Sequence, residues 1–243
     1  KVLQIERGEA SGTKNVQGAI LYADALEKII PDFREEAPLE RHVIEQRIWM
    51  LDDKSYVGQH YRSDAFNSDK PNRYTILRAQ FDRWFSEQVR KAGALVITET
   101  TVLELIRNEQ GRVTGVLTDR SPQPVTADAV ILADGVNSVL ARKAGLRPEI
   151  EAKNVALAVK EVIFLPQEVL EQRFNLKDEE GVVIEMAGSI TKGMVGTGFL
   201  YTNRESIAIG VGCMLSNFKG SKQTPYKMLE DMKNHPAIAP LIA

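Results

Sequence analysis

Cysteine is nearly absent from this chain of 243 residues, in which Cys213 stands alone. One cysteine excludes an internal disulfide, and it also excludes a cysteine-ligated iron–sulfur cluster or a cysteine-rich zinc site built within the chain. Histidine is scarce too: His42, His60 and His235 are scattered, without the spacing of a metal-binding pair. We therefore expect no metal site, and we interpret Cys213 as a small buried apolar residue.

Long hydrophobic runs and a large charge of one sign are also missing. The apolar run at Val130–Ala133 is far shorter than the roughly 20 residues that a membrane-spanning helix needs. The formal net charge of −2 gives no reason to expect nucleic acid as a partner. Apolar residues make up 43% of the chain and charged residues 26%, which is typical of a globular protein with a real core.

The two ends of the sequence predict a piece of a longer protein. The chain begins at Lys1 and enters the strand-like segment Val2–Glu6 at once, without a polar lead-in. It stops at Ala243 without a polar tail. We expect an internal fragment.

The order of predicted elements favours an α/β nucleotide-binding part joined to a sheet-rich second part, with a boundary near residue 150. Before that boundary, strands or periodic helical segments are predicted at Val2–Glu6, Val16–Ile30, Phe81–Lys91, Ala94–Ile97, Val102–Arg107, Val113–Leu117 and Ala127–Ala133, with two further strands and a turn at Asp52–Lys54 between Arg41 and Ser63. After it, long strands are predicted at Val155–Phe164, Gly181–Met186, Met194–Tyr201 and Ser206–Met214, followed by a helix at Pro225–Asn234.

The segment Ala127–Ala133 predicts a buried strand that stops at Asp134, turns on Gly135 and enters a helix running to about Gly145. Ligands of open α/β sheets bind at the carboxyl ends of strands, where the next helix offers free N–H groups. Asp134 and Gly135 are therefore candidates for contact with a phosphate or a ribose. An ordinary strand-to-helix turn explains the same two residues, because Asp favours such turns and Gly supplies unusual dihedral angles.

A strand that ends in an acidic residue is typical of the second half of a dinucleotide-binding unit. There the carboxylate binds ribose hydroxyls about 20 residues after a G-x-G-x-x-G turn. Glu6 fits that position, but the chain contains no G-x-G-x-x-G, so we expect the glycine-rich turn upstream of Lys1. A solvated surface glutamate is the alternative interpretation of Glu6.

A series of short motifs runs through the whole chain in one order: Ile5–Gly8, Lys14-Asn15, Tyr74–Arg78, Phe81–Trp84, Ala92–Ala94, Val130–Ser138, Val159–Ile163, Gly198–Asn203 and His235–Ile238. Together these motifs resemble the FAD-dependent electron-transfer flavoprotein:quinone oxidoreductases of the FixC type. That group is similar in fold to geranylgeranyl reductases and to aromatic-hydroxylase-like flavoproteins.

The resemblance implies an α/β (α+β) fold with two domains. An incomplete FAD/NAD(P)-binding Rossmann-like domain is expected at residues 1–40 and 76–150. A β-sheet-rich domain of the hydroxylase-like type, on the substrate or quinone side, is expected at residues 41–75 and 151–243.

The resemblance also implies FAD as the cofactor and assigns roles to single residues. Glu6, with Arg7 beside it, is expected at the ribose of the adenosine part, and Arg78 at the pyrophosphate or the ribityl chain. The remaining expected contacts are Lys14 and Asn15 in the loop passing the cofactor, Val102 through its backbone at the adenine, and Asp134 and Gly135 in a second nucleotide-contacting motif. Pairing of Arg78 with Asp82, one helical turn on, is the alternative for that arginine. Related hydroxylases write the second motif D-G-x-x-S-x-x-R; here Arg142 comes one residue late.

The activity implied by the resemblance is electron transfer from an electron-transfer flavoprotein, through the flavin, towards quinone or ferredoxin. Catalytic residues stay unknown, because no acid–base pair or nucleophile is evident. Because the chain has one cysteine, an iron–sulfur relay is expected downstream or on a ferredoxin-like partner subunit. The expected location is cytoplasmic, with a peripheral position at the inner face of the membrane for a quinone reducer.

Two other functions stay open on sequence grounds. One is a geranylgeranyl-reductase-like or hydroxylase-like flavoenzyme acting on an organic substrate. The other is a non-catalytic interaction domain that keeps the fold without the cofactor. For a flavoprotein parent, we expect the fragment itself to bind FAD poorly or not at all and to be inactive, because it lacks the glycine-rich turn.

Overall fold

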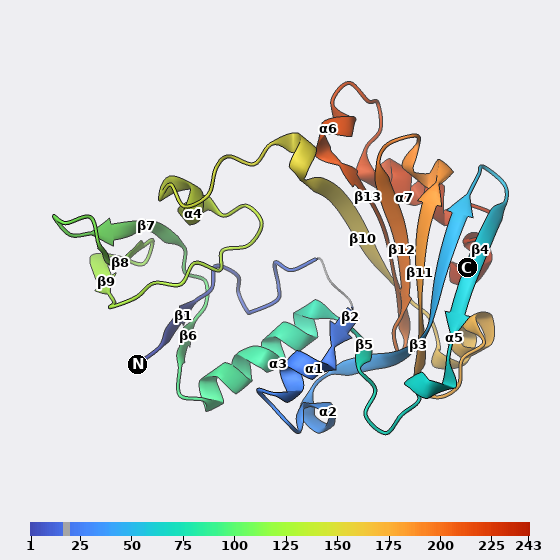
Figure 1. The fold of residues 1–243 in the computed structure, drawn as a ribbon, viewed down its shortest axis with the longest axis horizontal. Helices are drawn as coiled ribbons and strands as arrows, with labels where there is room; N and C mark the ends of the chain where they lie inside the picture. The colour runs from blue at the N-terminus through green and yellow to red at the C-terminus, as the bar shows by residue number, and fades with distance from the viewer. Residues whose placement is uncertain (17–19) are drawn as a thin grey trace. The chain divides into compact units, whose positions relative to one another are not determined.

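A computed structural model describes residues 1–16 and 20–243, and these divide into two compact units (Figure 1). Unit 1 comprises Lys1–Asn15 and Ala79–Ile150, and unit 2 comprises Val16–Arg78 and Glu151–Ala243. The units differ from the expected domains over residues 16–40 and 76–78, which are assigned to unit 2. The physical reason is that Ile20–Tyr22 pairs with a strand of the unit 2 sheet and that Phe33 packs edge-on against Tyr74.

Unit 1 contains two small sheets and two helices. Its elements are β1 (Leu3–Ile5), α3 (Arg78–Lys91, of which Arg78 is assigned to unit 2), β6 (Leu95–Ile97), β7 (Val102–Arg107), β8 (Val113–Thr118), β9 (Ser121–Thr126) and α4 (Val139–Lys143). β1 and β6 are parallel, whereas β7, β8 and β9 form an antiparallel sheet in that order. The predicted strands β1, β6, β7 and β8 and the helix α3 are confirmed.

Strand β9 was not predicted from the sequence, and it contains Pro122 and Pro124. Proline cannot donate to a strand ladder and is tolerated on an edge strand. β9 is such an edge, since it pairs with β8 alone within the described residues.

The predicted buried strand at Ala127–Ala133 is wrong. From Ala127 to Ser138 the chain has neither helix nor strand, and the side chain of Ile131 is 90% exposed. An apolar run forms a buried strand only when neighbouring strands accept its hydrogen bonds. Among the described residues, β1 and β6 pair with each other and with no third strand, and the segment itself makes one backbone hydrogen bond to a strand, from Ala127 N–H to Thr114 O of β8.

Unit 2 is built on one mixed eight-stranded sheet, with strand order β10-β13-β12-β11-β3-β5-β2 and with β4 paired to β3. All its strand pairs are antiparallel except β3 with β11. Its elements are β2 (Ile20–Tyr22), α1 (Ala23–Glu27), α2 (Phe33–Glu36), β3 (Leu39–Leu51), β4 (Tyr56–Arg62), η1 (Asp64–Phe66), β5 (Arg73–Ile76), η2 (Ala152–Asn154), β10 (Ala156–Phe164), α5 (Gln167–Phe174), β11 (Glu180–Gly188), η3 (Ser189–Thr191), β12 (Gly196–Thr202), β13 (Ser206–Met214), α6 (Leu215–Phe218), α7 (Pro225–Lys233) and α8 (Ala239–Ile242).

The long strands, the turn at Asp52–Lys54 and the helix at Pro225–Asn234 are confirmed as β3, β4, β10 to β13 and α7. The periodic segment expected at Val16–Ile30 is divided: residues 17–19 lie outside the described residues, and β2 and α1 account for most of the rest. Local periodicity marked this segment as apolar, whereas pairing with β5 decided that it begins as a strand.

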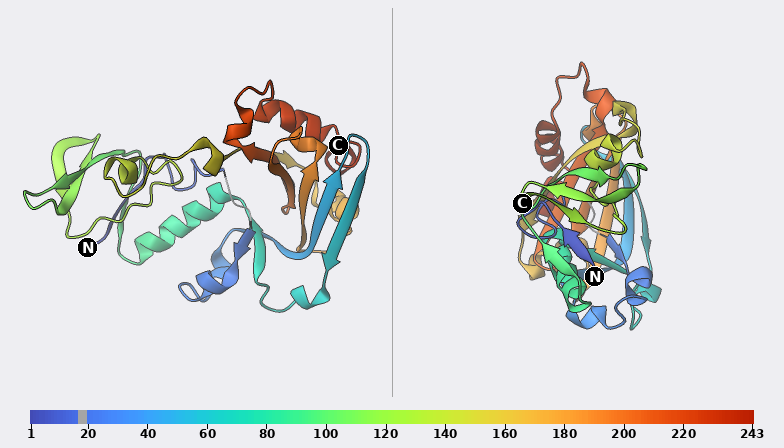
Figure 2. Two further views of the ribbon diagram at one scale, coloured as in Figure 1. Left: turned by 45° about the horizontal axis from the view of Figure 1, so that its top comes forward. Right: turned by 90° about the vertical axis from the view of Figure 1, so that its left-hand side faces the viewer.

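The core of unit 2 lies on one face of this sheet. Strand alternation places Ile207, Ile209, Val211 and Cys213 of β13 on that face, all fully buried. α7 covers them with Met228, Leu229 and Met232, and Figure 2 shows the C-terminal helices, in red, against the strands. Cys213 is therefore the buried apolar residue expected from the sequence, and burial raises the pKa of its thiol.

A buried carboxylate lies at the centre of an ion-pair cluster on β3 and β4. Glu45, only 4% exposed, accepts from Arg47 Nε at 2.7 Å and from Arg62 Nη1 at 3.3 Å. Burial raises the pKa of the Glu45 carboxyl, but the hydrogen bonds and charges of Arg47 and Arg62 outweigh it, so the pKa lies below its ordinary value of 4.5.

This cluster predicts acid sensitivity of unit 2. A carboxyl whose pKa is lower in the folded state stabilises the protein above its unfolded pKa, and that stability is lost as the pH falls through the folded pKa. The Glu45 contribution is thus present above about pH 4.5. We expect Glu45→Gln to flatten the decline of unfolding free energy below that pH, measured by urea unfolding between pH 6 and pH 3. Exposed Glu168→Gln is the control, and identical declines in wild type and Glu45→Gln would contradict the prediction.

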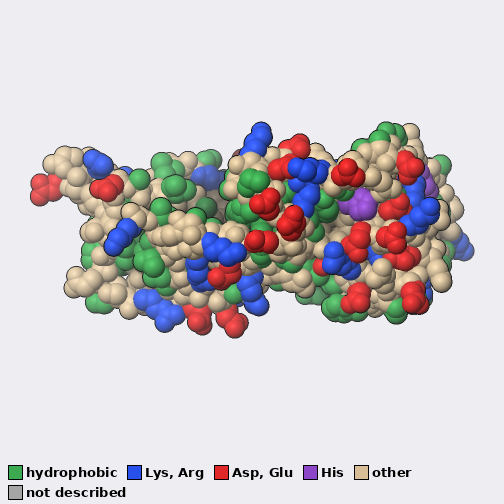
Figure 3. Space-filling model, turned by 90° about the horizontal axis from the view of Figure 1, so that it is seen from below, with side chains coloured by type: hydrophobic (Ala, Val, Ile, Leu, Met, Phe, Trp, Pro, Cys, Tyr) green, Lys and Arg blue, Asp and Glu red, His purple; other side chains and the backbone are tan. Residues whose placement is uncertain are grey.

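The surface shows charges of both signs. Figure 3 shows acidic and basic side chains intermixed on one face, in agreement with the small net charge. Across residues 1–16 and 20–243, no helix has both the length and the hydropathy needed to cross a bilayer.

Candidate functional site

Glu6 lies at the carboxyl end of the parallel strand β1. Its backbone N–H donates to Ile97 O at 2.8 Å, and its carbonyl accepts from Thr100 N at 3.0 Å. Its Oε1 accepts from the N–H of Gly8 at 2.6 Å. A Cβ on Gly8 would lie 3.1 Å from that oxygen and 2.6 Å from Thr13 Oγ1, so glycine is what lets the turn close around the carboxylate. The side chain is thus held at the end of the sheet where ligands of α/β folds bind.

The chemistry of this turn fits a ribose. A ribose diol donates hydrogen bonds, and the Glu6 carboxylate keeps acceptor capacity, since Gly8 is its one hydrogen-bond donor within the described part of the chain. In the same loop, Ser11 Oγ is buried without a protein partner. Arg7, next to Glu6, is exposed. The turn can therefore accept hydrogen bonds from a ligand with hydroxyl groups, and the role of Glu6 at the ribose of FAD stays a prediction.

The loop after this turn is tied to α3. Asn15 Nδ2 donates to Asp82 Oδ2 at 2.5 Å, while Lys14 is exposed. Arg78 is the first residue of α3 and is partly buried. Asp82, which the sequence offered as an alternative partner of Arg78, thus accepts a hydrogen bond from the side-chain amide of Asn15. Asn15 is one of the residues expected beside the cofactor.

The Asp134-Gly135 turn is ordered by helix capping. Asp134 Oδ2 accepts from the N–H of Leu140 at 3.0 Å, which fixes the start of α4. Gly135 has a φ of +78°, and a Cβ placed on it would meet no atom within 4 Å. α4 packs against β7, whose first residue, Val102, is half-buried and pairs with Thr118. Capping explains the aspartate, and the open space beside Gly135 leaves room for a ligand.

Seven of the eight candidate residues thus lie in unit 1, and Arg78 is assigned to unit 2. Sequence reasoning left out Gly8 and Arg147, and it gave Ser138 and Arg142 no firm role. The signal for Gly8 was the Glu-x-Gly spacing at Glu6. No local signal marked Arg147, which follows the helix by four residues.

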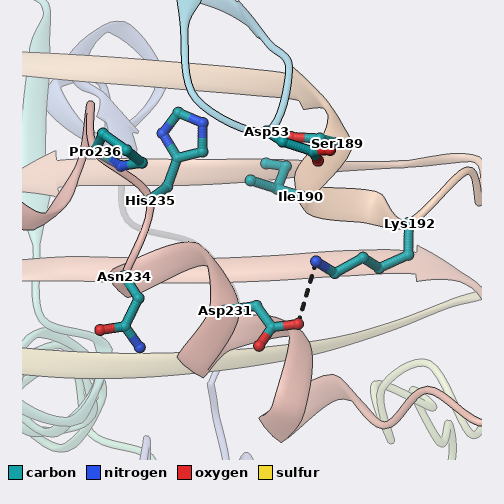
Figure 4. A pocket seen from close by; sticks show the side chains of 8 residues that line it. All are labelled: Asp53, Ser189, Ile190, Lys192, Asp231, Asn234, His235 and Pro236. Atoms are coloured by element: carbon teal, nitrogen blue, oxygen red, sulfur yellow. Dashed lines mark ion pairs between the residues drawn. The ribbon is translucent and has the colours of Figure 1, made fainter.

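Two hollows lie apart from these residues. One, of about 120 Å³, lies in unit 2, and two of the charged groups that line it pair with each other: Lys192 Nζ lies 3.1 Å from Asp231 Oδ2 (Figure 4). In the same hollow, His235 Nδ1 accepts from Ala237 N–H at 3.1 Å, so Nε2 carries the proton and donates to Asp52 O at 2.8 Å. The other hollow, of about 420 Å³, lies in unit 1 beside Arg112 and Asp128. Neither contains a candidate residue.

The charged pair Lys160-Glu161 on β10 is divided between the two faces of the unit 2 sheet. Glu161 pairs with Lys233 of α7 at 2.9 Å, on the core side. Lys160 lies on the other face, opposite Gly210, where burial and then the charge of Arg78 lower the pKa of its ammonium group. Within the described residues, no group of histidine, cysteine and acidic side chains could hold a metal ion.

Comparison with known sequences finds extensive similarity and no matching family model. The chain is 62% identical over 243 residues to "Protein FixC" of Bradyrhizobium diazoefficiens, 65% to that of Azotobacter vinelandii and 43% to that of Escherichia coli K12. Each alignment covers 100% of this chain and 56% of the relative. The chain thus spans just over half the length of these curated relatives.

Comparison with solved structures finds the same fold in flavoproteins. A geranylgeranyl bacteriochlorophyll reductase-like protein from Thermoplasma acidophilum has a TM-score of 0.75 at 23% identity, over 98% of this chain and 57% of that one. The myxobacterial halogenase CndH, described as FAD-dependent, has a TM-score of 0.71 at 14% identity, over 100% and 54%. CtdE in complex with FAD has a TM-score of 0.59 at 17% identity, over 88% and 53%.

These similarities confirm two expectations. The fold class is the α/β (α+β) class expected, and the fold is shared with the reductase-like protein and with the FAD-dependent halogenase CndH. Along its whole length, the chain is similar in sequence to the FixC proteins.

Proposed function

We propose that the whole protein is an FAD-dependent oxidoreductase that passes electrons from an electron-transfer flavoprotein towards quinone or ferredoxin. The observation that carries the cofactor part is the Glu6 carboxylate, held at the end of β1 by the Gly8 N–H. The electron-transfer part rests on the resemblance to FixC-type sequences, which extends over all 243 residues. The flavin supplies the redox chemistry, and the residues of this chain bind and orient it.

In this proposal Glu6 accepts from the ribose, with Arg7 beside it. Lys14 and Asn15 line the loop passing the cofactor, Arg78 provides a forked cation for phosphate oxygens, and Val102 contributes its backbone. Asp134 and Gly135 contribute the second turn. The partners are an electron-transfer flavoprotein and a ferredoxin-like iron–sulfur subunit, at a cytoplasmic site that includes the inner face of the membrane.

The cofactor assignment predicts a specific loss in the full-length protein. Glu6→Gln removes a charged acceptor, and we expect FAD binding to weaken about 10- to 100-fold, which corresponds to a hydrogen bond to a charged group. The dissociation constant is measured by flavin fluorescence on adding FAD to apoprotein. Glu9→Gln, in the same loop and exposed, is the control. Equal affinity in wild type and Glu6→Gln would remove Glu6 from the site.

A second experiment separates the electron donors. Anaerobic full-length protein is mixed with reduced electron-transfer flavoprotein or with NAD(P)H, and bleaching of the flavin band is followed. Reduction by the flavoprotein alone supports the proposal. Reduction by NAD(P)H, with turnover of an organic substrate, would support the alternative that the fold of the reductase-like protein favours. Full-length protein without bound flavin would instead favour a non-catalytic interaction domain.

A further inference from the structure

Side chains hold the turn Asp134–Ser138 in place by hydrogen bonds to its backbone carbonyl groups. Three consecutive carbonyls accept side-chain donors: Gly135 O from Ser138 Oγ at 2.8 Å, Val136 O from Arg147 Nη1 at 3.2 Å, and Asn137 O from Arg142 Nε at 3.0 Å. With these carbonyls occupied, the groups of the turn that stay available to a ligand are its N–H groups. In the described part of the chain, the N–H groups of Gly135, Val136 and Asn137 donate no hydrogen bond.

Ser138 joins two of these contacts. It is 7% exposed, and its hydroxyl donates to Gly135 O while it accepts from Arg147 Nη1 at 2.5 Å. Its φ of +43° is a left-handed conformation, which costs a non-glycine residue about 1–2 kcal/mol. Such a conformation persists only where surrounding contacts determine it. The chain Arg147–Ser138–Gly135 provides these contacts.

The two arginines differ in how they are held. Arg142 is anchored by Glu149 at 2.5 Å, so one of its donors is occupied outside the turn. Arg147 reaches the turn twice with one nitrogen, at Val136 O and at Ser138 Oγ. Removal of Arg147 therefore releases both a carbonyl and the serine hydroxyl.

We propose that Arg147, acting through Ser138, is the positioning residue that orders the Asp134–Ser138 turn for the cofactor. This inference rests on the proposed function, in which Asp134 and Gly135 contact FAD. Arg147 itself contacts residues of the turn, and its effect on the cofactor is exerted through them. Its loss leaves Gly135 and Ser138 free to leave their left-handed conformations, so FAD has to order the turn when it binds.

The test uses full-length apoprotein. We expect Arg147→Met to weaken FAD binding about tenfold, the effect of losing one charge-assisted hydrogen bond. We expect Ser138→Ala to do the same. The double variant should lose less affinity than the two single losses combined, because both substitutions remove the shared Arg147–Ser138 contact. Arg147→Lys, which keeps a cation, should recover part of the affinity. Arg90→Met, which removes an exposed ion pair on α3, is the control.

A second readout does not depend on FAD. Hydrogen exchange of the amides of residues 135–138 in the apoprotein should be faster in Arg147→Met, whereas the midpoint of thermal unfolding should stay that of wild type. If wild-type protein binds FAD and the Arg147→Met variant shows unchanged FAD affinity or unchanged amide exchange, this inference is overturned. The proposed function is then unaffected. Wild-type protein that binds no FAD would overturn both.

Discussion

Replacing Arg41 with methionine is expected to lower the free energy of unfolding of unit 2 by about 3–5 kcal/mol, the cost of breaking a buried charged network. Arg41 is 1% exposed, although it lies on a strand with polar neighbours. Its side chain donates to five acceptors: Asn203 O at 2.7 Å, Asp178 O at 2.7 Å, Glu180 O at 3.0 Å, Arg204 O at 3.2 Å and Glu171 Oε1 at 3.3 Å.

These five contacts match the five N–H donors of a guanidinium group. They join β3 to α5, to the segment before β11 and to the turn between β12 and β13. Methionine fills part of the volume but leaves four carbonyl groups without that donor. Two of them, Asn203 O and Glu180 O, make buried hydrogen bonds, so leaving them unpaired costs free energy. The loss is therefore larger than that of an ordinary surface arginine.

Urea unfolding followed by far-UV circular dichroism measures this effect. Arg204→Met is the matched control, because the Arg204 side chain is 55% exposed and pairs with Glu179 at 2.9 Å. An exposed pair is worth about 1 kcal/mol or less. Equal losses for the two variants would show that burial of Arg41 contributes nothing special.

Replacing Gly188 with alanine is expected to cost about 3 kcal/mol or more, at the upper end of single substitutions. Gly188 ends β11 with a φ of +111° and a ψ of −138°, a conformation that glycine adopts readily and other residues do not. A Cβ there would lie 2.0 Å from Leu51 O. Leu51 is its register partner on β3, so relief requires the β3–β11 pairing to open.

Gly193→Ala separates strain from collision. Gly193 also has a positive φ, of +78°, but a Cβ on it meets nothing within 4 Å. We expect a cost of about 1 kcal/mol there, which is the conformational part alone. Both variants are measured by thermal and urea unfolding. A Gly188→Ala variant as stable as Gly193→Ala would show that the end of β11 adjusts without cost.

Much of the fold could be predicted because its elements have strong local patterns. β13 alternates Ile207, Ile209 and Val211 with small residues, and α7 places Met228 and Met232 one turn apart. These patterns depend on neighbouring residues alone, so they are visible in the sequence. The same reasoning failed at Ala127–Ala133, where the apolar run implied burial but no described strand forms a ladder with it. It also missed β9, whose prolines are acceptable only at an edge.

The candidate site shows the same division. The acidic end of the first strand and the Asp-Gly pair were evident as motifs, and they led to Glu6, Asp134 and Gly135. The geometry of Glu6 agrees with a binding role, because the Gly8 N–H orients its carboxylate. The structure shows that Asp134 accepts from the N–H of Leu140 in the first turn of α4, which no motif revealed.

The sequence by itself determined the fold class, most of the strands, the similarity to FixC proteins and the residues expected at FAD. Only the tertiary structure decided that Arg41 is buried, that residues 20–40 belong with the large sheet and that Arg147 holds the Asp134–Ser138 turn. The physical reason is the distance along the chain over which each kind of interaction acts. Periodicity and motifs reflect residues a few positions apart, whereas the burial of a charge and the partner of a carbonyl are set by segments distant in the chain.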